Sequence, residues 1–183
     1  MKLILPLIAF LSFTLVASAT DRQLQIDEIR EATFRYLFRK NASSLKEKAQ
    51  VYFLTLGELA QTQSHDPDDA FMRRFLDNKP RVSKRSKSIE SPEGVKDMTT
   101  GETGLVFNVG AIEWISDEEV QVSGGYFEAG LSASGNTYHL IKKKGVWVVS
   151  TEKMHWISRA SRMPKQAGPI NVVLAGVRKG FAP

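Results

Sequence analysis

Three side chains of acid–base type lie close together in the second half of the chain. Tyr126 and Glu128 are two residues apart, so both point to the same face of a sheet if they lie in one regular strand. A turn predicted at residues 134–136 folds His139 back beside that strand. A carboxylate, an imidazole and a phenol in an apolar cavity form an acid–base group with shifted pKa values. The alternatives are a non-catalytic pocket and the solvent face of an antiparallel sheet, which is where polar side chains commonly lie.

Aromatic side chains are the second set with a chemical use. Trp114, Trp147 and Trp156 fall in three different predicted strands, and Tyr52 falls in another. Such rings stack on flat ligands, but more often they pack in a core with the polar ring atom bonded to a neighbour. We expect Tyr52 and Trp114 to line a ligand pocket together with the acid–base group.

No metal site or cofactor is predicted. His65 precedes three aspartates within 65–69, but this segment is also typical of a helix start, with Asp66 as the cap and Pro67 at the first helical position. Cysteine is absent, which excludes thiolate nucleophiles, cysteine-ligated zinc and iron–sulfur clusters. The sequence also lacks a nucleophile elbow, a phosphate-binding loop and a dinucleotide fingerprint.

The first half of the mature chain is predicted to combine two helices with two strands. The predicted elements are a helix at 25–40, a strand at 49–54 closed by Gly57, a short helix from Asp66 to residue 77, and an edge strand at 81–89. Apolar residues recur at helical spacing in 25–40, and β-forming residues dominate 49–54. Alternating basic residues in 81–89 are typical of an edge strand.

The second half predicts an antiparallel meander of four long strands. Short turn sequences separate runs of alternating apolar and polar residues. Gly124 and Gly125 lie where the apolar alternation shifts, which predicts a β-bulge. The fold class is therefore α+β, with N-terminal helices packed on a curved antiparallel β-sheet. The predicted strands are 105–115, 120–131, 137–143 and 146–157.

This order of elements resembles the cystatin-like α+β roll of the nuclear-transport-factor-2-like superfamily, which includes ketosteroid isomerases and polyketide cyclases. Several segments are similar to exported bacterial members of that superfamily, namely 51–58, 125–131, 145–149 and 154–158. The resemblance covers residues 25–158 and implies a conical pocket between helices and sheet. The isomerase relatives imply an acidic base paired with tyrosine and acid donors inside that cone, although none of the matching segments is a catalytic signature.

The N-terminus predicts export. Lys2 precedes an apolar run at 3–16, and small residues at 17–19 have the spacing of a signal-peptidase site. The run is shorter than the roughly 20 residues that a membrane-spanning helix needs. We expect cleavage after Ala19, a periplasmic or secreted protein, and no membrane span after signal removal. The predicted divisions are a signal peptide at 1–19, a domain at 20–158 and a basic C-terminal tail at 159–183.

The basic charge belongs to the tail. The whole chain carries a formal charge of +5, and loss of Lys2 with the signal leaves +4. The tail holds five basic residues and no acids, so the body is close to neutral at −1. Nucleic acid is not an expected partner, because the basic clusters contain no interleaved aromatic residues for base stacking.

The leading hypothesis is an exported small-ligand-binding or scaffold domain without catalysis, whose ligand is a small apolar molecule. One alternative is a cofactor-independent lyase, isomerase or hydrolase that uses acid–base residues in the conical pocket. The other is an interaction module that forms a homodimer through its sheet and binds a partner with its basic tail.

Overall fold

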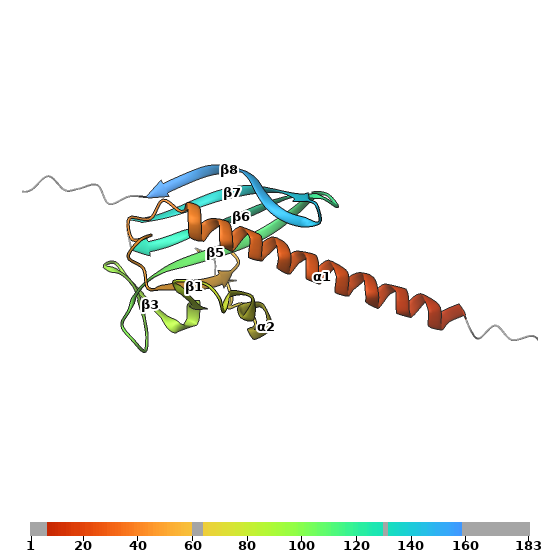
Figure 1. Ribbon diagram of the computed structural model, residues 1–183, viewed down its shortest axis with the longest axis horizontal. Helices are drawn as coiled ribbons and strands as arrows, with labels where there is room; N and C mark the ends of the chain where they lie inside the picture. The colour runs from red at the N-terminus through yellow and green to blue at the C-terminus, as the bar shows by residue number, and fades with distance from the viewer. Residues whose placement is uncertain (1–6, 60–63, 130–131, 159–183) are drawn as a thin grey trace, which may run out of the picture.

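The computed structural model describes residues 7–59, 64–129 and 132–158. Helical and extended elements alternate at first and then give way to a run of long strands (Figure 1). In order they are α1 Leu7–Lys40, β1 Val51–Leu56, α2 Asp69–Met72, the 3-10 turn η1 Arg73–Phe75, β2 Arg81–Lys84, the 3-10 turn η2 Arg85–Lys87, β3 Ser88–Ser91, β4 Gly94–Asp97, β5 Thr103–Ser116, β6 Glu119–Ala129, β7 Ser132–Lys143 and β8 Val146–Ser158.

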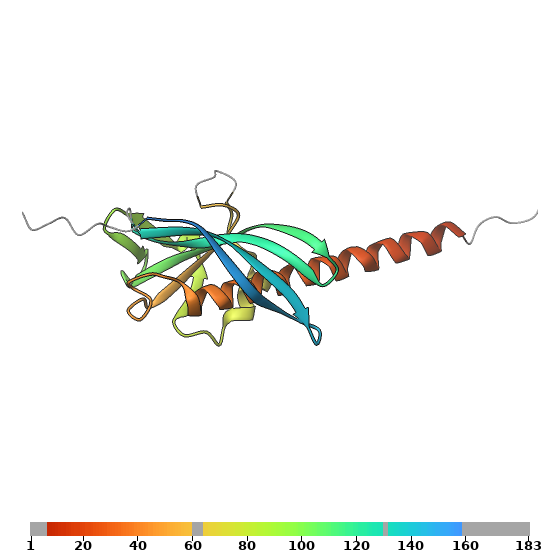
Figure 2. The same cartoon turned by 90° about the horizontal axis from the view of Figure 1, so that it is seen from above.

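Helix α1 lies across one face of the sheet with its C-terminal half and extends beyond the sheet with its N-terminal half (Figures 1 and 2). The helix predicted at 25–40 is confirmed, and it continues back to Leu7, so the predicted cleavage point after Ala19 falls within it. Its buried residues repeat at helical spacing, as an amphipathic helix requires: Ile29, Thr33, Phe34, Leu37 and Phe38. None of the helices in residues 7–59, 64–129 and 132–158 is long and apolar enough to cross a membrane.

The sheet has eight strands and is mixed, which corrects the expectation of a wholly antiparallel, curved sheet. Its main path runs β2-β1-β5-β6-β7-β8, and β4 pairs with both β3 and the start of β5. Strand β1 is parallel to both β2 and β5. Parallel neighbours need a crossover connection, and the segment 57–102 provides it. The sheet is not strongly curled, and one long helix, rather than several helices, packs against it.

The predicted four-strand meander is confirmed as β5 to β8, with two corrections. Residues 134–136 are not a turn but lie inside β7, and β6 ends earlier, at Ala129. Gly124 and Gly125 are not a bulge in β6, because β6 and β7 pair without a shift from Glu119 to Phe127. A register shift does begin at the Val109–Gly124 pair, but it leaves the extra residue on β5. These glycines instead permit close approach of strands: a side chain on Gly125 would overlap the Ser134 carbonyl oxygen.

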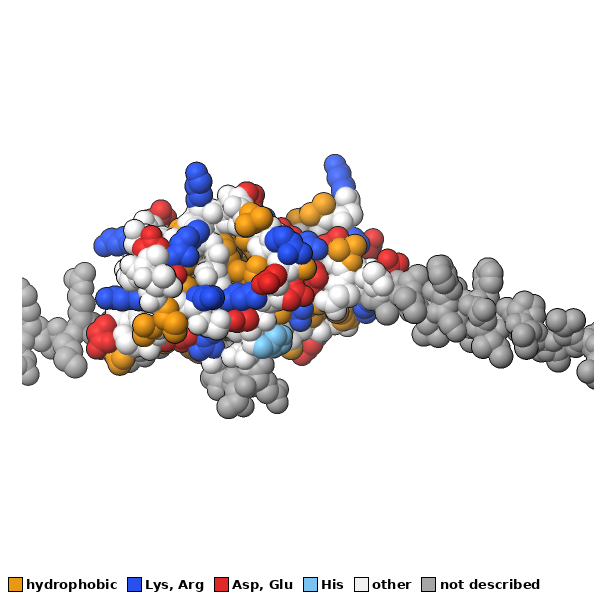
Figure 3. Space-filling view, turned by 90° about the horizontal axis from the view of Figure 1, so that it is seen from below, with side chains coloured by type: hydrophobic (Ala, Val, Ile, Leu, Met, Phe, Trp, Pro, Cys, Tyr) orange, Lys and Arg blue, Asp and Glu red, His pale blue; other side chains and the backbone are white. Residues whose placement is uncertain are grey.

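The short helix and the edge strand are confirmed in shortened form. The N-cap is Asp68 rather than Asp66, and its carboxylate accepts a hydrogen bond of 2.7 Å from the Phe71 N–H. The predicted edge strand is divided into β2, η2 and β3, and the hairpin partner β4 was not predicted. The side of the molecule seen in Figure 3 carries basic and acidic side chains close together, consistent with a charged edge that discourages pairing with other strands.

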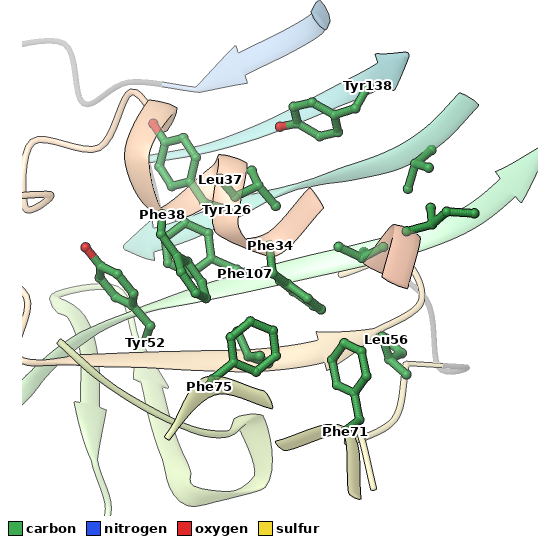
Figure 4. Close-up of a cluster of buried hydrophobic side chains, with 14 of the residues drawn as sticks. Phe34, Leu37, Phe38, Tyr52, Leu56, Phe71, Phe75, Phe107, Tyr126 and Tyr138 are labelled. Atoms are coloured by element: carbon green, nitrogen blue, oxygen red, sulfur yellow. The ribbon is translucent and has the colours of Figure 1, made fainter. Parts of the chain in front are cut away.

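The main core lies between α1 and the sheet and is rich in aromatic rings (Figure 4). Phe38 contacts Tyr52 and Phe107, with ring centroids 4.9 and 5.2 Å apart, and Phe34 contacts Phe75 edge to face. A second, smaller core formed by Val51, Phe53, Val95 and Val106 is packed against Leu59 and Phe127. In both β1 and β5 its residues alternate with those of the main core, so it lies on the sheet face opposite α1.

Candidate ligand-binding groove

The predicted pocket residues Tyr52, Tyr126 and Trp114 belong to or pack against the main core. Tyr52 and Tyr126 are 4% and 1% exposed, and Tyr52 makes an edge-to-face contact with Phe107 at 5.0 Å (Figure 4). Trp114 is half-buried and contacts Trp147 edge to face at 5.8 Å, while the Arg22 guanidinium lies 3.5 Å from the centre of its ring. These three side chains therefore take part in core packing on the α1 side of the sheet.

Glu128 holds the loop after α1 against the end of β6. Its Oε2 accepts hydrogen bonds from the Ser43 hydroxyl, the Ser132 hydroxyl and the Ser44 N–H at 2.7, 2.9 and 3.1 Å. Its Oε1 accepts from the Ser44 hydroxyl at 2.6 Å. Burial alone would raise the pKa of Glu128, but these hydrogen bonds outweigh it and lower the pKa below its ordinary value. A carboxylate that accepts four hydrogen bonds stabilises the fold by linking the loop after α1 to β6 and the start of β7.

The predicted proximity of Glu128 and His139 is wrong. In the β6–β7 register His139 pairs with Gln121, whereas Ser134 pairs with Tyr126. His139 instead lies between Glu119, whose Oε1 is 2.6 Å from Nε2, and Ser150, whose Oγ is 2.9 Å from Nδ1. The reason is the position of the β6–β7 connection, since moving it along the chain changes every pair in an antiparallel ladder.

The Glu119–His139–Ser150 group contains the residue types of a hydrolytic triad but not its proton arrangement. The Ser150 hydroxyl donates to the His139 carbonyl oxygen at 3.0 Å, so its proton is directed away from the imidazole. An activated serine must instead donate to the ring nitrogen that accepts its proton. The group is a cross-strand polar contact that ties β6, β7 and β8 together.

A cavity of about 500 Å³ lies between α1 and the start of β8. Three of the five charged side chains that line it pair with one another: the Glu31 carboxylate accepts hydrogen bonds from Arg35 at 2.8 Å and from Arg74 at 2.9 Å. Arg35 also donates to the Arg74 carbonyl oxygen at 2.6 Å. These contacts hold η1 against α1 and leave no unpaired charge on these three side chains for a ligand.

A larger groove, of about 740 Å³, lies on the sheet face opposite α1. Strands β5 to β8 form its floor, and the segments after β1 and around η2 and β3 form its wall. Its lining mixes aromatic, small and polar residues: Glu58, Leu59, Arg85, Glu90, Asn108, Ser123, Gly124, Phe127, Ala133, Ser134, Gly135, Asn136, Thr137, His155 and Trp156. Of the tryptophans only Trp156 lies in it, and none of the five residues predicted from the sequence does.

Two features of β7 and β8 place Trp156 over this groove. Gly135 pairs with Trp156, and a Cβ on Gly135 would lie 2.6 Å from the indole Cε2, so the ring occupies the space above the glycine. The β7–β8 register shifts between Gly135 and Asn136, which leaves His155 as an extra residue on β8. A bulge of this kind redirects side chains, and here the consecutive residues His155 and Trp156 both line the groove.

The polar side chains of the groove are oriented by bonds to neighbouring elements. The Ser123 hydroxyl donates to Glu58 Oε1 at 2.5 Å and accepts from the Ala111 N–H at 2.9 Å. His155 Nε2 lies 2.8 Å from the Thr137 hydroxyl. The Asn108 amide donates to the carbonyl of Gly57, whose φ of 98° directs the chain out of β1. These contacts pre-orient the groups that a ligand would meet.

The wall carries a two-point ion pair. The Arg85 guanidinium donates to both oxygens of Glu90, at 2.6 and 3.0 Å, and to the Ser64 hydroxyl at 3.2 Å. Glu58 adds a second carboxylate to the groove. The charged side chains among the lining residues are thus two acids and one arginine that is already paired, so the groove is suited to a neutral ligand rather than an anion.

Comparison of the chain with models of protein families, with curated proteins and with solved structures finds no match. The residues 7–59, 64–129 and 132–158 contain no cluster of three or more histidine, cysteine or acidic side chains able to hold a metal ion. Sequence reasoning missed the groove because Glu58 and Ser123 are distant in the chain, and only the sheet brings them together. The signal available in the sequence was His155-Trp156, because two consecutive large side chains near the end of a strand interrupt the alternation of apolar and polar residues.

Proposed function

We propose that this chain is an exported binding domain for a small ligand, and that the ligand occupies the groove on the sheet face opposite α1. We also propose that it is a distant member of the nuclear-transport-factor-2-like superfamily, since a long helix crosses a meander of four strands. In this proposal the ligand lies on the outer face of the sheet, because aromatic side chains pack beneath α1 and the cavity between α1 and β8 contains the mutually paired Glu31, Arg35 and Arg74.

The exposed indole of Trp156 is the main support for this proposal. Trp156 is 53% exposed although it is one of the largest apolar side chains, and it lies against Gly135 rather than in a core. A large aromatic ring in a groove that also contains oriented polar groups is typical of small-molecule sites. The groove volume falls within the range of roughly 300–1,000 Å³ common for such sites.

The test is ligand capture by the mature protein and by two variants of β8. Wild type is purified from its native host under non-denaturing conditions and measured by native mass spectrometry, with Trp156→Ala and Met154→Ala purified in the same way. We expect a bound small molecule on wild type and on Met154→Ala, and its loss from Trp156→Ala. Met154 is the matched control because it is exposed, apolar and on the same strand, but outside the groove lining.

The other two functions considered from the sequence predict different results. If the protein is a dimeric interaction module, its solution mass should be twice that of the monomer at micromolar concentration, and Trp156→Ala should no longer dimerise. An enzyme predicts conversion of the captured ligand when it is returned to the purified protein. Ligand retained equally by all three proteins would refute the groove as the binding site.

A further inference from the structure

We infer that the ligand of the groove is a neutral saccharide, with one face of a sugar ring stacked on Trp156. This inference rests on the proposed binding function and adds the chemical class of the ligand. It follows from three properties of the groove: an aromatic platform, hydrogen-bonding groups beside it, and the absence of an available positive charge among its lining side chains.

The platform is the indole of Trp156. Because Gly135 has no side chain, the ring packs against the backbone of β7 on one side, and about half of its surface remains exposed. A sugar ring has an apolar face of C–H groups that matches an indole face in size. Stacking of a ring on an aromatic side chain contributes roughly 1–3 kcal/mol in other recognition systems. Phe127 lies in the same groove and extends its apolar surface.

Hydrogen-bonding groups line the same groove as the ring and are available to the hydroxyl groups of a stacked sugar. The Glu58 carboxylate is oriented by Ser123, and the His155 imidazole is positioned by Thr137. A carboxylate accepts two hydroxyl protons and an imidazole both donates and accepts, so the set matches a polyhydroxylated ligand. A purely apolar ligand would leave the remaining acceptor positions of the Glu58 carboxylate without partners on binding, which is unfavourable.

Charge argues for a neutral sugar over an ionic ligand. Arg85 already donates to both oxygens of Glu90, so an anionic ligand would meet the Glu58 carboxylate without a compensating free cation in the lining. Glu58 keeps its negative charge, because its partner Ser123 is a neutral hydroxyl, whereas Glu90 is paired with Arg85. A cationic ligand could therefore pair with Glu58 alone, and choline tests that alternative in the experiment below. The rest of the polar lining consists of hydroxyl, amide and imidazole groups, which favour a neutral polyhydroxylated ligand.

The experiment screens ¹⁵N-labelled mature protein by NMR and follows the indole N–H signals, which are assigned with a Trp156→Phe variant. The probes are neutral trisaccharides of glucose, N-acetylglucosamine and xylose, with choline, glucuronate and a hydrophobic dye as comparators. We expect at least one trisaccharide to shift the Trp156 signal, while the signal of Trp147, 3% exposed on the other side of the sheet, stays unchanged.

Affinity is then measured for wild type, Gly135→Ala and Met154→Ala. The added methyl of Gly135→Ala displaces the indole without removing it, and the three nearest atoms that it meets all belong to the exposed Trp156 ring, so the fold is retained. We expect saccharide affinity to fall at least about tenfold in Gly135→Ala, on the scale of stacking contributions, and to stay within about twofold in Met154→Ala.

Three results overturn the inference. Binding of choline, glucuronate or the dye in place of any trisaccharide, with a shift of the Trp156 signal, refutes the saccharide class while the proposed groove function stands. Saccharide binding that is unaffected by Gly135→Ala also refutes it, because the sugar then lies elsewhere. No shift of the Trp156 signal with any probe, together with no small molecule captured from the native host, refutes both the inference and the function on which it rests.

Discussion

The clearest stability prediction concerns Glu128, whose carboxylate receives four hydrogen bonds within 3.1 Å from Ser43, Ser44 and Ser132. Hydrogen bonds to a charged group contribute about 1.5–3 kcal/mol each, but Ser44 is exposed and water replaces part of what it loses. We therefore expect Glu128→Ala to lower the free energy of unfolding by about 3 kcal/mol. Glu128→Gln keeps the shape but loses the charge and replaces one acceptor oxygen with an amide donor; with the amide nitrogen toward the Ser44 hydroxyl, which can rotate to accept, we expect a loss of about 1 kcal/mol.

The assay is chemical denaturation at neutral pH, followed by near-UV circular dichroism, with a thermal scan as a second measurement. For a domain of this size, 3 kcal/mol corresponds to a fall in Tm of roughly 9 °C. Glu119→Ala is the control, because Glu119 is a more exposed carboxylate bonded to His139, and surface pairs of this kind contribute about 1 kcal/mol or less. A Glu128→Ala protein within 1 kcal/mol of wild type would refute the structural role.

The pH dependence gives an independent check of the same reasoning. The serine hydrogen bonds lower the pKa of Glu128 in the folded state below its ordinary value of 4.5. The stabilisation is therefore complete above that value and is lost as the pH falls through the lower folded pKa. We expect the stability difference between wild type and Glu128→Gln to be constant from pH 7 to pH 5 and to shrink at lower pH. A difference that does not vary down to pH 3 would contradict the predicted protonation.

Three further predictions concern other parts of the molecule. Gly125→Ala should lower the free energy of unfolding by about 3 kcal/mol, because its methyl meets the Ser134 carbonyl of a paired strand. Gly135→Ala should lower it by less than half as much, because its methyl meets a side chain that can move. Equal losses for the two variants in chemical denaturation would refute this distinction. The Thr100 N–H, the Arg81 guanidinium and the Thr99 N–H lower the pKa of Asp97 from 3.8 to about 2. The Tm advantage of wild type over Asp97→Asn should therefore be full well above pH 3.8 and fall as the pH drops through about 2; an advantage at pH 2 as large as that at neutral pH would contradict it. Protein from the native host should begin at Thr20, and an intact mass that includes residues 1–19 would show that the predicted cleavage does not occur.

Local patterns predicted the elements that depend on neighbouring residues in the chain. The helical spacing from Ile29 to Phe38 predicted the buried face of α1, and alternation in the second half predicted β5 to β8. Those patterns reflect burial of one side of an element, which is a property of the element itself. The short strand β4 was missed, because its Gly94–Asp97 segment is too brief to show alternation.

Contacts between distant segments required the tertiary structure. The alternation that predicted β6 and β7 did not determine their register, and the pairing of His139 with Gln121 separates His139 from Glu128. Burial of Tyr52 and Tyr126 in the main core follows from the packing of α1 on the sheet.

The sequence by itself determined that this is a cysteine-free α+β chain with a long helix and a four-strand meander, because local periodicity records which side of each element is buried. Only the tertiary structure decided where the groove lies and which residues line it. Strand register, the extra residue at His155 and the absence of a side chain at Gly135 together bring Trp156 into the same groove as Glu58, and none of these can be derived from periodicity. The physical reason is that register depends on the whole set of cross-strand contacts rather than on any one segment.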